Sequence, residues 1–177
     1  MIKPVGSDEL QPLFVYDPDK HHQLMHEAES LPSVMISSQA AGNAVMMGGG
    51  YFTPLKGFMN LADAMGTCEG MRMTDGTFFP VPVMCLLESV DAIRGANRIA
   101  LRDPNMEGNP ILAVMDVAAI EQIGDDQMAY MTDKVYRTDD AEHPGVSAFN
   151  SQGRFAVSGP IQVLHFSYFQ DDFPDTF

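Results

Sequence analysis

The chain has 177 residues, of which 45% are hydrophobic and 19% charged, a composition typical of one globular domain and too apolar for a disordered chain. Its 24 acidic residues against 10 basic residues leave a formal charge of -14, which opposes binding to the phosphate backbone of nucleic acids. The first six residues contain no apolar run and later apolar stretches are too interrupted to span a bilayer, so we expect a cytoplasmic protein with neither a nucleic acid nor a membrane as partner.

The first third of the chain predicts three helices and one short strand. A polar helix over 18–29 ends before a proline, and Val34 and Ile36 indicate a strand. Ser38 is predicted to cap a helix through Met47, and Asn60 a second helix to Met65, since Ser and Asn side chains accept hydrogen bonds from free amides at helix starts.

The middle of the chain is typical of β-structure. Asp75-Gly76 is a strong hairpin signal between 71–74 and the apolar run 78–87, whose two prolines place its start at a sheet edge. Residues 99–102 and 111–117 are predicted to pair around a loop rich in Pro, Gly and Asn.

The last third predicts one helix and two closing strands. Asp125 or Asp126 caps a helix in which Met128, Met131 and Val135 share one face. A polar loop over 138–145 follows, and the strands 155–157 and 161–166 are separated by Ser-Gly-Pro. Because the strands come as consecutive hairpins, we expect an α+β, β-rich, mostly antiparallel barrel-like domain with about four short helices.

Two residue types that often build sites are read as structural. Cys68 and Cys85 form no C-x-x-C or Cys/His pattern and are expected to be reduced and buried. His21, His22 and His26 lie near two glutamates on one predicted helix, but the spacing supplies no further ligand, so a solvated helix face is preferred over a metal site.

Two loops could take part in ligand binding or catalysis, but a structural role is preferred for each. Gly48–Gly50 could approach a phosphate, but no P-loop pattern completes them, and a helix stop is preferred. The acidic loop contains Asp139, Asp140, Glu142 and His143 without an adjacent nucleophile. A structural or domain-contact role is therefore preferred over general base catalysis.

The run Gly50–Met59, GYFTPLKGFM, resembles the G-x-F-[ST]-P-L-x-G-F-M element of bacterial ATP sulfurylases (sulfate adenylyltransferases). Pro54 would stiffen a turn there and Gly57 would allow close backbone approach. The resemblance continues in order through six further segments: 37–39, 75–82, 109–117, 136–138, 143–146 and 159–164.

This resemblance implies that residues 1–165 form the PUA-like amino-terminal domain of such an enzyme and that 166–177 form an aromatic tail leading towards a catalytic domain. The enzymes join ATP and sulfate into adenosine 5'-phosphosulfate and pyrophosphate. ATP and magnesium are thus implied for the full-length enzyme, the catalytic domain is the expected partner, and the full-length enzyme is expected to be a homo-oligomer.

The family's Q-x-R-N-P and H-x-x-H substrate motifs are missing from this sequence. Gln152-Gly153-Arg154 is followed by Phe155, and His22 to His26 has the wrong spacing. No catalytic, cofactor-binding or metal-binding residue is therefore assigned, and we expect the chain alone to be inactive. The alternative is a stand-alone PUA-like module that binds RNA or protein.

The end of the chain crowds five aromatic rings into twelve residues. Such a cluster is rarely exposed without a role, so the hypothesis is a docking surface, and the alternative is packing onto the domain's own core. The rings are Phe166, Tyr168, Phe169, Phe173 and Phe177.

Overall fold

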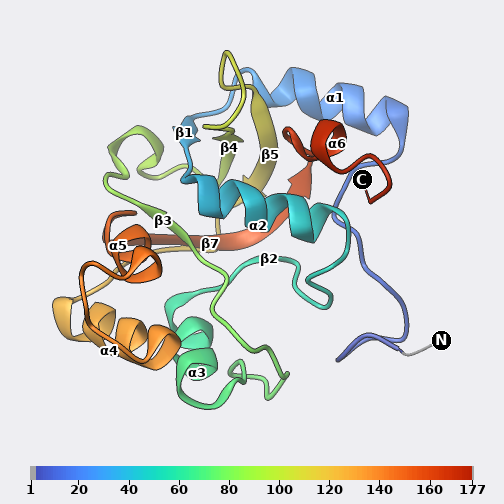
Figure 1. Cartoon of the computed structure of the whole chain (residues 1–177). Coiled ribbons are helices and arrows are strands. Elements are labelled where there is room, and N and C mark those ends of the chain that lie inside the picture. Colours follow the sequence, from blue (N-terminus) through green and yellow to red (C-terminus); the bar gives the residue numbers. More distant parts are fainter. Residues whose placement is uncertain (1–2, 177) are drawn as a thin grey trace.

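A computed structural model describes residues 3–176 and arranges them around one seven-stranded sheet (Figure 1). The strand order is β1-β4-β5-β7-β2, and β3 and β6 also pair with β7. All pairings are antiparallel except that between β1 and β4. The strands are β1 (Ser33–Met35), β2 (Gly57–Phe58), β3 (Cys85–Leu87), β4 (Arg98–Arg102), β5 (Ile111–Asp116), β6 (Ala119–Gln122) and β7 (Phe155–Val163).

Six α-helices and one short 3-10 helix, η1 (Asp91–Ile93), accompany the sheet in the described residues. In Figure 1, α1 lies at one end of the molecule, α2 crosses the sheet, and α3, α4 and α5 gather at the opposite end. None of these helices is long and apolar enough to cross a bilayer. The helices are α1 (Pro18–Ala28), α2 (Ser38–Gly48), α3 (Leu61–Gly70), α4 (Asp125–Tyr136), α5 (Pro144–Asn150) and α6 (Phe169–Asp172).

The helix starts follow capping chemistry, in two cases one residue away from the prediction. Asn60 caps α3 through Asp63 N, as expected. Ser37, and not Ser38, caps α2 by accepting from Ala40 N. Gly124, and not Asp125 or Asp126, precedes α4, where the Gln127 side chain accepts from its amide.

The two closing strands predicted around Ser158-Gly159-Pro160 are in fact the single strand β7. Gly159 has a φ of 147°, a value that residues other than glycine rarely adopt. The chain therefore bends there without leaving the sheet. The residues before the bend pair with β3 and β6, and those after it pair with β2 and β5. The bend therefore curls the two halves of the sheet around β7.

Three further expectations need correction. The predicted hairpin forms its turn, where the Met73 amide donates to Thr77 O at 2.9 Å and Arg72 bridges Phe78, but long strands do not follow. Residues 79–84 are irregular because their prolines cannot donate to a ladder. The polar loop over 138–145 ends in α5, and β6 lies between two predicted elements. The described residues accordingly contain six α-helices, where about four were expected. The α+β class with a mostly antiparallel sheet is confirmed.

Three buried clusters hold the layers together. The largest joins α2 to the sheet, where Ala41, Ala44 and Val45 are fully buried. A second joins α3, α4 and α5 to β3 and β7 through Met128 and Met131. The third places α1 against β4 and β5. Burial of these apolar side chains is the main source of stability.

Candidate functional site

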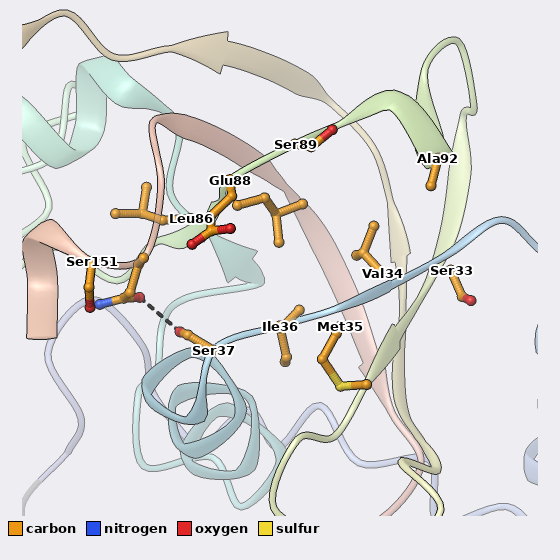
Figure 2. Close-up of a pocket in the computed structure, with 12 residues that line it drawn as sticks. Ser33, Val34, Met35, Ile36, Ser37, Leu86, Glu88, Ser89, Ala92 and Ser151 are labelled. Atoms are coloured by element: carbon orange, nitrogen blue, oxygen red, sulfur yellow. Dashed lines mark hydrogen bonds between the residues drawn. The ribbon is translucent and has the colours of Figure 1, made fainter.

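A cavity of about 540 Å³ lies between the edge strand β1 and the end of β3 (Figure 2). One wall is formed by residues 33–37, which run from β1 into the start of α2. The facing wall is formed by 86–89, and residues 151–152 close one end. The cavity therefore lies at a free edge of the sheet, where a backbone has hydrogen-bonding groups to offer.

A short side-chain network lies at the end of this cavity closed by residues 151–152. Ser37 Oγ donates to Gln152 Oε1 at 2.8 Å (Figure 2), and Gln152 Nε2 donates to Gln39 Oε1 at 2.7 Å. Glu88 adds one carboxylate to the wall, and the described lining residues include no Lys, Arg or His. The cavity can accept and donate hydrogen bonds, but it lacks the positive charge that would hold a polyphosphate.

The segment Gly50–Met59 fixes an edge of the sheet. Its β2 pairs Gly57 with Pro160 and Phe58 with Gly159. A Cβ on Gly57 would lie 2.0 Å from the carbonyl oxygen of Gly159, so the close backbone approach expected from the sequence is confirmed. Leu55, Phe58 and Met59 are buried.

The glycines Gly48–Gly50 end α2, as predicted. The Gly49 amide donates to Val45 O at 3.0 Å and the Gly50 amide to Met47 O at 3.1 Å. Gly50 has a φ of 81°, which glycine accepts without strain. These amides are thus used within the chain and are not aimed at a ligand.

The three histidines of α1 do not act together. His21 Nε2 lies 2.6 Å from the carbonyl oxygen of Leu164, which ties α1 to the segment after β7. His22 and His26 are exposed. Among residues 3–176 no three His, Cys, Asp or Glu side chains converge as metal ligands. The structure gives His21 a structural contact that the sequence pattern did not reveal.

His143 of the acidic loop caps α5. Its Nδ1 accepts hydrogen bonds from Gly145 N at 3.2 Å and Val146 N at 3.4 Å, and its ring lies 5.7 Å from that of Tyr136. With Nδ1 accepting two backbone protons, the ring holds the loop against α4 and α5. His143 thus has a structural contact, and the preference for a structural or domain-contact role of the acidic loop over general base catalysis stays a prediction.

The structure also contains a buried polar cluster that no sequence pattern indicates. Asp103 is fully buried, and His165 Nδ1 accepts from Ser167 N at 2.8 Å. Asp103 Oδ2, His165 Nε2 and Ser167 Oγ are buried without a hydrogen-bond partner in the described part of the chain. Asp103 lies 62 positions before His165 in the sequence. No local pattern predicts their proximity, because only the fold brings them into one region.

Burial lowers the pKa of His165 below its usual value of 6.5, and the charge of Asp103 opposes that effect, while His21 adds to it. The ring is therefore disposed to stay neutral in the folded chain. None of Asp103, His165 and Ser167 lines the cavity between β1 and β3, so no substrate-sized space faces this cluster there.

Both cysteines are free thiols, and Cys85 is fully buried while Cys68 is half-buried. Burial raises the pKa of the Cys85 thiol to about 12 and that of Cys68 to about 11. The thiolate is the reactive form of cysteine, so neither residue is a nucleophile near neutral pH. The expectation of reduced thiols holds, with Cys68 less buried than expected.

The aromatic tail fits the docking hypothesis in one part and packing onto the domain's own core in another. Phe166 is buried and stacks on Phe14 with ring centroids 4.5 Å apart. Tyr168 and Phe173 are exposed, and Phe169 is half-buried. Phe177 lies outside the described residues. The tail thus begins in the core and ends on the surface.

Known proteins and a known domain family match this chain over nearly all of its length. The family model of a PUA-like domain matches residues 2–166. A sulfate adenylyltransferase of Allochromatium vinosum is 73% identical over 177 residues, which are all of this chain and 45% of that protein. A sulfate adenylyltransferase of the Riftia pachyptila sulfur-oxidizing endosymbiont is 70% identical over all of this chain and 40% of its own length.

A solved structure supports the fold alone. The hexameric APS kinase from Thiobacillus denitrificans superposes with a TM-score of 0.65 at 24% identity, over 94% of this chain and 27% of that protein. The chain spans less than half the length of the two curated relatives above. On the family match and the curled sheet together, the chain belongs to the PUA-like domain family.

Proposed function

We propose that this chain is the non-catalytic amino-terminal domain of a cytoplasmic sulfate adenylyltransferase, with residues 1–165 as the domain and 166–177 as the tail that leads to the catalytic part. The observation that carries the proposal is 73% identity over every residue of this chain to a sulfate adenylyltransferase of which it spans only 45%. The remaining 55% of that relative has room for the substrate site.

The chemistry of the reaction supports this division of labour. Sulfate attacks the α-phosphorus of ATP, and pyrophosphate leaves, so cations and oriented donors must surround developing negative charge. In this chain Arg98 forms ion pairs with Glu27 and Asp116, and Arg154 forms one with Asp125. The cavity between β1 and β3 carries a carboxylate and no cation among its described residues.

ATP and magnesium are assigned to the full-length enzyme and not to this chain. Mg²⁺ takes oxygen ligands in a near-octahedral arrangement, and the residues between 3 and 176 do not bring three acidic or histidine ligands together. We therefore propose that the catalytic part of the enzyme holds the ion together with the phosphates of ATP. The role left to this domain is to support the catalytic part and to form a wall beside it.

We further propose that the full-length enzyme is a homo-oligomer. The structural neighbour is described as hexameric and the curated relatives are longer than this chain. The surface that joins subunits is not assigned to any residue of this domain.

The test compares this chain with a chimera in which it replaces the matching 177 residues of the Allochromatium vinosum relative. Sulfate-dependent release of pyrophosphate from ATP and Mg²⁺ is measured for both proteins beside a thermal melt. We expect both to unfold cooperatively and only the chimera to turn over. Sustained turnover by the isolated chain, or a folded chimera without activity, would contradict the proposal.

A further inference from the structure

One apolar groove stands out on the surface, defined by the side chains of Val5, Leu10, Tyr51, Phe78 and Val81 around a hollow of about 490 Å³. These five residues are between 40% and 61% exposed and make up half of the ten exposed large hydrophobic residues in the described part of the chain. Soluble domains rarely gather exposed apolar side chains in one place without a partner.

The groove is held in shape by the fold. Its three walls come from residues 3–10, 50–53 and 78–81. Gln11 N donates to Thr53 Oγ1 at 2.9 Å, which joins the first wall to the second. Phe79 also lines the hollow but is buried, and its ring packs edge-on against that of Phe52 with centroids 5.9 Å apart. The exposed rings and aliphatic chains are therefore supported by packed residues beneath them. This rigidity lowers the entropy cost of docking.

The end of the described chain lies at this groove. Tyr51, in the groove wall, donates its hydroxyl hydrogen to the carbonyl oxygen of Thr176 at 3.1 Å. The tail thus runs from the core at Phe166 to the rim of the groove. Because the relatives have more than twice this length, their further polypeptide would start beside exposed apolar surface.

We propose that the apolar groove is the docking surface for the polypeptide that follows residue 177 in the full-length enzyme. This inference rests on the proposed function. The occupant is a segment of the catalytic part that carries apolar side chains, since the groove offers rings, proline and aliphatic groups and few charges. The docking surface is thus made mainly by residues remote in sequence from the aromatic tail.

Hydrogen exchange tests the proposal on the isolated chain and on the chimera described above. Amides in peptides covering 4–10 and 78–82 are expected to exchange about tenfold more slowly in the chimera. Leu10→Asp and Val81→Asp in the chimera should remove most of that protection, because a carboxylate would have to be buried in an apolar contact.

The matched control is Tyr16→Asp, since Tyr16 is 65% exposed against 61% for Leu10 but lies outside the groove. It should leave the protection of both peptides unchanged. Equal exchange of the groove peptides in chain and chimera would overturn the inference even if the chimera forms adenosine 5'-phosphosulfate. A protected groove in an inactive chimera would support docking and overturn the proposed function instead.

Discussion

Gly57 and Gly159 are two glycines at which neighbouring backbone leaves no room for a side chain. Where β2 pairs with β7, Gly57 lies opposite Pro160, and Gly159 lies opposite Phe58. A Cβ on Gly57 would lie 2.0 Å from Gly159 O, and a Cβ on Gly159 would lie 2.0 Å from Asp116 O. Both clashes are with backbone, which cannot rotate away as a side chain can. The glycine of the family-like segment is therefore a steric requirement of the sheet.

Gly57→Ala is expected to lower the free energy of unfolding by about 3 kcal/mol or more, because strands β2 and β7 must separate to admit the methyl group. Urea unfolding monitored by circular dichroism measures the change. Gly42→Ala is the matched control, since Gly42 lies within α2 and its added Cβ meets nothing within 4 Å. That variant should gain about 0.5 to 1 kcal/mol from helix propensity. Equal stabilities would refute the steric account.

His165 makes the stability of the chain sensitive to mild acid. Its pKa is lowered in the folded chain by burial, so between that lowered value and 6.5 the unfolded chain binds more protons than the folded one. Stability therefore rises with pH through this window, is complete above about 6.5, and is lost as pH falls below it.

His165→Asn is expected to flatten this part of the pH profile, because the Asn Oδ1 can still accept from Ser167 N but does not titrate. The free energy of unfolding is measured by urea titration in steps of pH from about 7.5 to 5.5. The exposed His22→Asn serves as control and should keep the slope of the parent chain. A slope that His165→Asn leaves unchanged would show that other groups carry the pH dependence.

Arg98 links three elements at the start of β4. Its Nη1 donates to Glu27 of α1 at 2.7 Å, its Nη2 donates to Gln162 of β7 at 2.8 Å, and its Nε lies 3.0 Å from Asp116 of β5. The Arg98 side chain is 29% exposed, so water screens these contacts only in part. The guanidinium group suits such a junction because it offers donors in several fixed directions.

Arg98→Met is expected to lower the free energy of unfolding by about 1 to 2 kcal/mol, since Glu27 and Asp116 keep partial access to water after the loss. Arg94→Met is the matched control, because the Arg94 ion pair with Asp91 is largely exposed, and its effect should stay within about 0.5 kcal/mol. Chemical unfolding of the two variants side by side decides. Equal losses would mean that the junction contributes no more than a surface pair.

The charge of the whole molecule argues against nucleic acid as a partner. Eight of its ten cations contact carboxylates, carbonyl or amide oxygens, a hydroxyl group or an aromatic ring, which leaves few for phosphates. These eight are Lys3, Lys56, Arg72, Arg94, Arg98, Arg102, Lys134 and Arg154.

We expect no binding of mixed RNA at moderate salt tighter than about the micromolar end of the non-specific range. Fluorescence anisotropy of a labelled RNA pool measures it, and repeating the titration at higher salt identifies any electrostatic component. Tight, salt-sensitive binding would favour the stand-alone RNA-binding module over the domain of an enzyme.

At the scale of the whole molecule, local chemistry alone determined much of the secondary structure. The Asn60 cap, the helix stop at Gly48–Gly50 and the paired strands around the loop 103–110 depend on neighbours within a few residues, so the sequence predicts them. The family-like segment Gly50–Met59 likewise carried its close approach and buried side chains in its own residues.

Only the tertiary structure decided the features that join distant residues. Ser158-Gly159-Pro160 looks like a break, but antiparallel partners on both sides keep β7 continuous through the bend. The cluster of Asp103, His165 and Ser167 and the apolar groove between 3–10, 50–53 and 78–81 exist because the chain brings separate segments together. Periodicity and capping act over a few residues, whereas burial is decided by what packs from elsewhere in the chain.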